Sequence, residues 1–216
     1  MLIKEGHNVY GTARTEKLIN KFEKYCVCDL ATYDGLQKIR RFIKENKIDV
    51  LINNAGEYIY SSIQDITYEK LEHITKLNFE APLSLISASV PFMKENHFGR
   101  IINIGSISGV MGEANASLYS GTKSGLIGAT KALALELAEY NITVNTINPG
   151  WVDTELGNSS IEDSEFTKEE ILDCIPQKRF VESREIAGMI RYLISEEAKG
   201  VTGQSINLCA GLSVGY

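Results

Sequence analysis

The chain has 216 residues, of which 44% are hydrophobic, and this length and composition favour one globular domain with a sizeable core. Its formal net charge is −6, with lysines and glutamates dispersed along the chain, which argues against a nucleic-acid partner. No apolar run approaches the roughly 20 residues that span a bilayer, and residues 1–7 lack the apolar stretch of a signal peptide, so we expect no membrane partner and a cytoplasmic protein.

The predicted elements alternate between strand and helix. Strands are short apolar or β-branched runs followed by turn-forming residues, and helices carry apolar residues at helical spacing. In chain order we predict strands at 8–13 and 25–28, a helix at 32–46, a strand at 48–53, a helix at 68–93 that Pro82 kinks, a strand at 100–106, a helix at 117–140, a strand at 142–148, a helix at 183–195 and a strand at 205–209. This alternation predicts an α/β fold with a single doubly wound, mainly parallel sheet flanked by helices, over residues 1–216.

The cysteines and histidines do not form a metal-binding pattern. The four cysteines include no Cys-x-x-Cys pair, and Cys26 and Cys28 point the same way from one predicted strand, where packed, reduced thiols are the simpler interpretation. The histidines fall in separate elements, without companions at ligand spacing: His7, His73 and His97. We therefore predict no metal site.

Tyr119 and Lys123 lie one helical turn apart on the helix predicted at 117–140, and Ser106 ends the preceding strand. A tyrosine with a pKa near about 10 is a poor acid–base catalyst at neutral pH, but an ammonium on the same helix face favours the phenolate. A serine hydroxyl at the strand end could hold a carbonyl oxygen while the tyrosine protonates it, as carbonyl reduction requires. The same spacing is common on solvated helix faces, so the pair alone is a weak motif.

Two more polar or glycine-containing runs follow predicted strands. Asn53-Asn54-Ala55-Gly56 ends one strand, and Pro149-Gly150-Trp151-Val152-Asp153-Thr154 ends another. In open parallel sheets, ligands bind beyond the carboxyl ends of the strands. We therefore expect both runs to share one ligand-binding edge with Ser106.

Together these motifs resemble those of the short-chain dehydrogenases/reductases. Asn-Asn-Ala-Gly at 53–56, Asn78, Ser106, the Tyr119-x-x-x-Lys123 pair and Pro-Gly-x-x-x-Thr at 149–154 occur in the order and approximate spacing of that family, over essentially the whole chain. The compact bacterial members, such as 3-oxoacyl-acyl-carrier-protein reductases and related carbonyl reductases, are the most similar. The resemblance implies a Rossmann-like oxidoreductase that transfers a hydride between NADP(H) and a ketone, an oxoacyl group or a secondary alcohol.

The resemblance also assigns catalytic roles. Tyr119 would be the general acid or base, Lys123 would depress its pKa and hold the nicotinamide ribose, and Ser106 would orient the substrate oxygen. Asn78 would place a water in a proton relay, although a structural helix asparagine is the alternative, as Ser108 is the alternative to Ser106. Gly105 replaces a serine that is common in the family, and we expect this replacement to matter little.

Cofactor choice is predicted from the end of the first strand. Ala13 is neutral where an acidic residue would bind the adenosine ribose, and Arg14 follows it, which favours NADP(H) over NAD(H) unless Arg14 is simply a solvated residue. The resemblance implies further cofactor contacts, beyond Tyr119 and Lys123, at Asp29, Leu30, Asn53, Ala55, Gly56, Pro149, Gly150, Val152 and Thr154.

Residues 151–180 form a polar, acidic and irregular stretch with one short helical pattern around 167–174. In the family this region resembles a mobile lid over the substrate, and an ordinary surface loop is the alternative. Lid residues choose the substrate, which the sequence restricts only to a small-molecule or acyl-carrier-protein-bound carbonyl compound. The helices at 68–93 and 117–140 resemble those that form family dimer interfaces, so we expect a homodimer or homotetramer.

One family element has no counterpart in this sequence. Members open with a strand and a Thr-Gly-x-x-x-Gly-x-Gly turn that brings backbone N–H groups to the pyrophosphate, whereas residues 1–7 resemble the end of the following helix. We expect an N-terminally truncated domain in which the absent strand would lie between those at 8–13 and 48–53, and in which the loss of the turn impairs dinucleotide binding and therefore activity. The alternative is a non-catalytic family member, an interaction scaffold unable to bind the dinucleotide, and the nucleotide sequence ahead of Met1 would separate the two.

Overall fold

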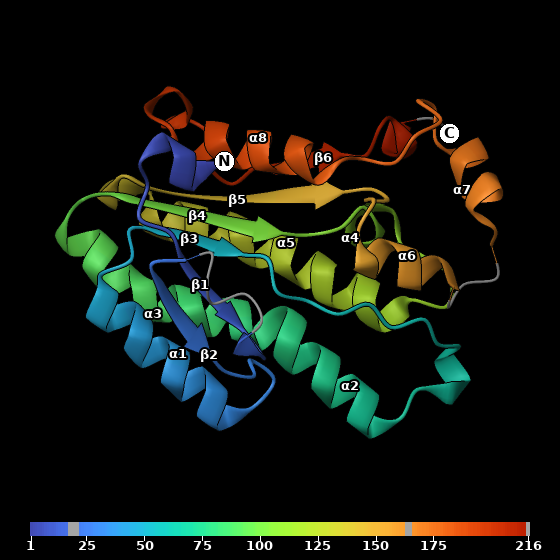
Figure 1. The fold of residues 1–216 in the computed structure, drawn as a ribbon, viewed down its shortest axis with the longest axis horizontal. Coiled ribbons are helices and arrows are strands. Elements are labelled where there is room, and N and C mark those ends of the chain that lie inside the picture. Colours follow the sequence, from blue (N-terminus) through green and yellow to red (C-terminus); the bar gives the residue numbers. More distant parts are fainter. Residues whose placement is uncertain (17–21, 163–165, 215–216) are drawn as a thin grey trace.

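The computed structural model describes residues 1–16, 22–162 and 166–214 and has the predicted alternation of strands and helices (Figure 1). In chain order the main elements are β1 (Tyr10–Ala13), β2 (Lys24–Val27), α1 (Tyr33–Asn46), β3 (Val50–Asn53), α2 (Tyr68–Thr75), α3 (Ala81–Glu95), β4 (Gly99–Ile104), α4 (Ser108–Met111), α5 (Ser117–Leu137), β5 (Ile142–Pro149), α6 (Glu155–Glu162), α7 (Lys168–Cys174), α8 (Ser183–Ile194) and β6 (Ser205–Leu208). Within the described ranges, no helix has both the length and the apolar character of a membrane span.

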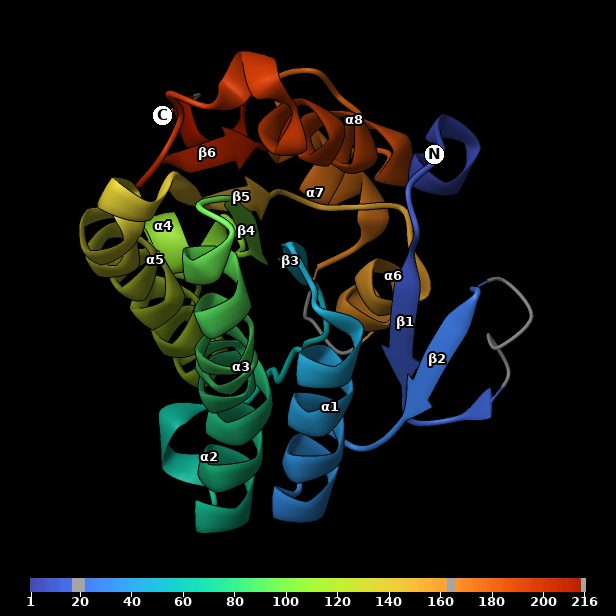
Figure 2. The ribbon, with the colours of Figure 1, turned by 90° about the vertical axis from the view of Figure 1, so that its left-hand side faces the viewer.

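The strands are parallel, which confirms the predicted fold class, but they form two sheets instead of one continuous sheet. β3, β4, β5 and β6 pair in that order, and β1 pairs with β2 separately. Figure 2 shows β1 and β2 standing apart from β3. Among the strands that the structure describes, none lies between β1 and β3, so the facing edges of these two strands have no ladder partner.

Helices cover both faces of the four-stranded sheet (Figure 2). Ile101 and Ile102 are neighbours on β4, so their side chains point to opposite faces. Ile101 packs in a buried cluster with Met93 of α3 and Leu137 of α5, whereas Ile102 packs with Leu193 of α8. All eight residues of β5 are buried, as expected for a central strand covered on both sides.

The predicted helix at 68–93 is interrupted at its centre. α2 and α3 are joined by a π-helical turn over Lys76–Glu80, which contains the buried Asn78. Pro82 has no N–H to give to the carbonyl of Asn78 four residues earlier, so a regular α-helical turn cannot close there. The expected kink therefore takes the form of a π turn.

The stretch at 151–180 is more regular than we expected. α7 confirms the short helical pattern, and Thr167 and Glu170 form a capping box at its start. α6 was not predicted, because its Gly-Asn-Ser-Ser run has low helix propensity. The Thr154 hydroxyl accepts a hydrogen bond from the N–H of Gly157 at 3.1 Å, which stabilises the start of α6.

Cys26 and Cys28 are packed, unbridged thiols, as predicted. Both are buried, Cys26 on β2 and Cys28 directly after it, and their Sγ atoms lie 3.9 Å apart. Burial, reinforced by the neighbouring Cys28, raises the pKa of the Cys26 thiol to about 11, so this thiol stays protonated at neutral pH.

Gly105 lies where the loop after β4 packs tightly against β5. Its N–H donates to the Ile147 carbonyl at 2.7 Å, and a Cβ at this position would collide with Oδ1 of Asn148 and lie 2.7 Å from Cγ2 of Thr146. The Asn148 side chain is buried and donates to Ser205 Oγ at 2.7 Å. The space around Gly105 therefore has no room for a side chain in this structure, and the expectation that glycine in place of the family's serine matters little stays a prediction.

We predict that Gly105→Ser lowers the free energy of unfolding by about 1–3 kcal/mol, because the added atoms overpack the space that Asn148 fills. Combining it with Asn148→Ala should recover at least about 1 kcal/mol relative to the sum of the single variants. Urea unfolding of the four proteins measures this coupling. Gly200→Ser is the control, since a Cβ there meets open space. Strictly additive losses would contradict the packing argument.

Candidate active site

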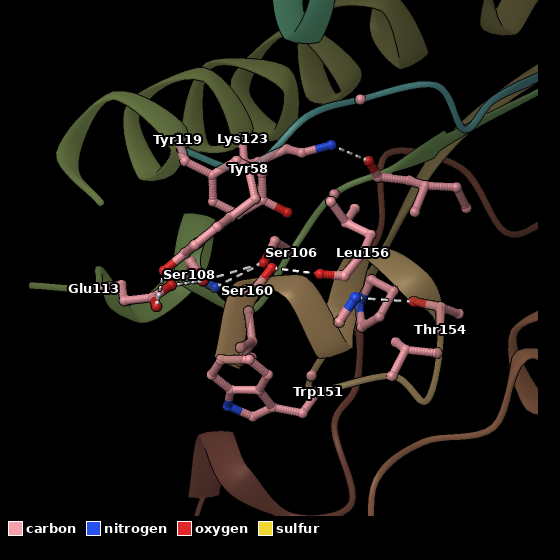
Figure 3. Close-up of a pocket in the computed structure, with 18 of the residues that line it drawn as sticks. Tyr58, Ser106, Ser108, Glu113, Tyr119, Lys123, Trp151, Thr154, Leu156 and Ser160 are labelled. Carbon is pink, nitrogen blue, oxygen red and sulfur yellow. Dashed lines mark hydrogen bonds between the residues drawn. The ribbon is translucent and has the colours of Figure 1, made fainter. Parts of the chain in front are cut away.

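A cavity of about 980 Å³ lies at the carboxyl ends of β3, β4 and β5, bounded on its other side by α6, α7 and α8 (Figure 3). Predicted site residues from the segments after β3, β4 and β5 and from α5 meet in its wall: Ala55, Gly56, Ser106, Tyr119, Lys123, Pro149, Gly150, Val152 and Thr154. Residues of the stretch at 151–180 also line it, including Trp151, Ile171 and Cys174. This position is the one expected of a lid, and the lid motion itself stays a prediction.

Lys123 brings a buried ammonium to the cavity. Its side chain is 5% exposed, and Nζ donates to the carbonyl of Ile104, at the end of β4, at 2.8 Å. Burial lowers the pKa of Lys123 to about 8, because the charged form loses its hydration. Nζ also lies 5.6 Å from the ring centroid of Tyr119, one turn earlier on α5.

The environment of Tyr119 corrects one sequence-based expectation. Burial raises the pKa of Tyr119, a hydrogen bond with Ser106 opposes this rise, and the charge of Glu113 adds to it. We expected Lys123 to lower this pKa. In this structure the effect of burial exceeds that of the Ser106 hydrogen bond, and the net change of the Tyr119 pKa is upward. Tyr119 is therefore a protonated phenol at neutral pH.

Asn78 lies behind the loop that follows β3. Its Nδ2 donates to the carbonyl of Glu57 at 2.8 Å, and its Oδ1 accepts from the N–H of the same residue at 2.9 Å. A Cβ at Gly56 would lie 3.2 Å from Asn78 Oδ1 and 3.4 Å from Lys123 Nζ, so Gly56 permits both groups to approach the loop closely. Asn78 thus braces the loop, and its role in a water relay stays a prediction.

A chain of hydroxyl groups ends on a carboxylate inside the cavity, and the sequence analysis missed it. The Ser106 hydroxyl donates to Ser108 Oγ at 3.2 Å, and Ser108 donates to Glu113 Oε2 at 2.6 Å (Figure 3). Tyr58 donates to Glu113 Oε1 at 2.7 Å, and its ring meets that of Tyr119 edge-on with centroids 5.0 Å apart. An available signal was that Tyr58 follows a strand end and Glu113 lies between Ser106 and Tyr119.

The other predicted cofactor contacts do not line this cavity. Arg14 is exposed after β1, whereas Asp29 and Leu30 follow β2, with Leu30 buried in the core. Asn53 is buried, and its Nδ2 donates to Asn103 Oδ1 at 2.8 Å. Arg14, Asp29 and Leu30 therefore lie with the separate two-stranded sheet, whereas Asn53 lies on β3 of the larger sheet. All four contacts stay predictions.

Comparison with known proteins relates this chain to oxidoreductases. Residues 2–213 match the family model described as enoyl-(acyl carrier protein) reductase. The 3-oxoacyl-[acyl-carrier-protein] reductase FabG of Buchnera aphidicola subsp. Schizaphis graminum is 35% identical over 220 residues, which cover 98% of this chain and 89% of the relative. The uncharacterized oxidoreductase YxjF of Bacillus subtilis is 40% identical over 174 residues, which cover 76% of this chain and 68% of the relative.

A solved structure of a variant actinorhodin polyketide ketoreductase with NADPH has the same fold. It matches with a TM-score of 0.91 and 31% sequence identity, over 98% of this chain and 89% of that one. The similarity therefore extends over nearly the whole of both chains.

We predict a distinctive pH dependence of stability from Lys123. Its folded-state pKa of about 8 lies below its ordinary value of 10.5, so the unfolded chain binds more protons between these values and the contribution of Lys123 to stability rises with pH. Lys123→Met should therefore be more stable than the wild type at pH 7, by up to about 3 kcal/mol, and should lose this advantage near pH 10.5.

Urea unfolding of both proteins across this pH range measures the difference, in which contributions from other titrating groups cancel. Lys131→Met, at an exposed lysine of α5, is the control for losing a lysine that is not buried. A flat difference for Lys123→Met would show that the buried ammonium does not control stability in this range.

Proposed function

The chain belongs to the short-chain dehydrogenase/reductase family, and we propose that it transfers a hydride between NADP(H) and a ketone, an oxoacyl group or a secondary alcohol. The observation that carries this proposal is the meeting of a protonated Tyr119, its hydrogen-bond partner Ser106 and the buried Lys123 in one cavity. A proton donor, a hydroxyl that holds the substrate oxygen and a cation are what carbonyl reduction requires of a protein.

Each of these residues has a separate task in the proposed reaction. In the proposed reaction Ser106 turns its single hydroxyl proton from Ser108 to the carbonyl oxygen. Tyr119 gives this oxygen its proton, and the raised pKa keeps the phenol protonated at neutral pH. The nicotinamide, when bound, supplies the hydride to the carbonyl carbon. Lys123 stabilises the negative charge that forms on Tyr119 after proton transfer, and the reverse steps oxidise an alcohol.

The residues around Lys123 fit the nicotinamide end of the cofactor. An ammonium has three donors, and the hydrogen bond of Lys123 in the described chain goes to the Ile104 carbonyl, which leaves donors for ribose hydroxyls. Pro149, Gly150 and Thr154 line the same cavity and are the proposed contacts of the carboxamide side. The solved ketoreductase relative contains NADPH, and Arg14 after a neutral Ala13 supports the same cofactor here.

The proposed partners are a small-molecule or acyl-carrier-protein-bound carbonyl compound and further copies of this chain. FabG and MabA proteins among the relatives are 3-oxoacyl-[acyl-carrier-protein] reductases by name. Leu135 on α5 is 85% exposed and Leu71 on α2 is 42% exposed, which supports an interface of these helices between subunits. We expect sedimentation to give a homodimer or homotetramer in a cytoplasmic protein, and a monomer would reject this assembly.

We predict that Tyr119→Phe lowers kcat by about 100-fold or more and changes KM little, because it removes the proton donor but almost no volume. The measurement is NADPH-dependent reduction of any ketone that the unsubstituted protein turns over, with the strand and glycine-rich turn of the family restored ahead of Met1 in both proteins. Tyr33→Phe, which alters a tyrosine that is 76% exposed on α1, is the matched control and should keep wild-type turnover. Near wild-type turnover of Tyr119→Phe would reject the assignment.

We predict that Arg14→Ala raises the Michaelis constant for NADPH far more than that for NADH. Loss of a charge-assisted hydrogen bond to the 2′-phosphate should cost about 1–3 kcal/mol for NADPH alone. Steady-state kinetics with both cofactors measures the ratio, and Arg41→Ala, at an exposed arginine of α1, controls for the loss of surface charge. Equal losses for both cofactors would disprove the pairing.

A further inference from the structure

We propose that Glu113 selects the substrate: the cavity favours carbonyl compounds and alcohols that present a hydroxyl near the reacting carbon, and rejects those that present a carboxylate there. This inference rests on the proposed oxidoreductase function and specifies its substrate class.

The Glu113 carboxylate is held in place near the reacting centre. Each of its oxygens accepts one hydrogen bond, from Tyr58 at 2.7 Å and from Ser108 at 2.6 Å. A carboxylate oxygen has two acceptor positions, so both oxygens can accept a further hydrogen bond from a ligand. Ser106, which is proposed to hold the substrate oxygen, is joined to this carboxylate through Ser108 (Figure 3).

The charge of Glu113 reaches the proposed catalytic residue. Burial raises the pKa of Tyr119 most, and the negative charge of Glu113 raises it further. A ligand bound against Tyr119 therefore also experiences this charge. A second negative charge on the ligand would be repelled, whereas a hydroxyl would find an acceptor.

The other charged groups of the cavity wall do not cancel this effect. Among its described residues, the acids are Glu57, Glu113 and Glu170, and Lys123 is the one lysine or arginine. Lys123 is proposed to serve the cofactor, Glu57 pairs with His73 at 3.0 Å, and Glu170 caps α7. Nothing in this set offers a cationic partner to a substrate carboxylate, and rejection by repulsion is a means of specificity.

The test uses three secondary alcohols that share a CH3–CH(OH)–CH2 unit and differ in the group attached to it. This group is hydroxymethyl in butane-1,3-diol, ethyl in 2-pentanol and a carboxylate in 3-hydroxybutyrate. Oxidation with NADP⁺ should give kcat/KM in that order, with the diol at least about 10-fold better than the carboxylate. Glu113→Gln should shrink the ratio of diol to carboxylate by about 10-fold or more, chiefly by improving 3-hydroxybutyrate. Glu57→Gln removes the same charge from the same cavity and should leave the ratio unchanged.

In this assay, two outcomes would overturn the inference: wild-type protein that oxidises 3-hydroxybutyrate as well as the diol, or equal changes of the ratio in the Glu113 and Glu57 variants. The order of kcat/KM for the three alcohols in the wild type tests the inference even if a variant fails to fold.

A second measurement separates this inference from the proposed function. Trp151 is the single tryptophan of the chain and lines the cavity, so its fluorescence reports binding of the same alcohols without cofactor or turnover. If no alcohol is oxidised but binding follows the same ranking and depends on Glu113, the proposed function fails and the inference stands. If the alcohols are oxidised without this ranking, the proposed function stands and the inference fails. If none of the three alcohols binds, the inference also fails.

Discussion

The hydrogen bond between the Lys123 ammonium and the Ile104 carbonyl joins α5 to the central sheet, and the rest of the candidate site depends on it. A buried ammonium is costly unless it is hydrogen-bonded, so this contact fixes both the rotation of α5 and its height above β4. Tyr119 lies one turn earlier on the same helix, and Ser106 lies two residues beyond Ile104. The Lys123–Ile104 hydrogen bond therefore helps to keep Lys123, Tyr119 and Ser106 at the cavity.

A chain of hydrogen-bonded, buried polar side chains links α5 to the strands on which the candidate site is built. Asn53 of β3 donates to Asn103 of β4, which donates to Thr130 of α5, and the Thr130 hydroxyl shares a 2.7 Å hydrogen bond with Thr146 of β5. Each bond joins two different elements. A buried polar group that loses its hydrogen-bond partner destabilises the folded state. The network thus specifies how α5 and the three strands meet, which hydrophobic packing alone does not, because apolar contacts have no direction.

The division of the strands into two sheets separates the predicted chemistry from the predicted cofactor choice. The residues proposed to act on the substrate lie on the four-stranded sheet and α5, which are covered by helices on both faces. Arg14, proposed to discriminate the cofactor, follows β1 on the smaller sheet. A change in the placement of that sheet can therefore alter cofactor binding while the Tyr119 side of the cavity keeps its geometry.

By itself, the sequence determined the identity and order of most elements and the positions of Ser106, Tyr119 and Lys123, because hydrophobic periodicity and local motif spacing are short-range properties of the chain. Only the tertiary structure decided that Glu113 meets Tyr58, 55 residues away, in the wall of the cavity. It also decided the division of the sheet, the formation of α6 against its weak helix propensity, and the upward direction of the Tyr119 pKa. The physical reason is common to all of these: burial, contact and desolvation depend on which distant segments pack together, and local spacing does not encode that packing.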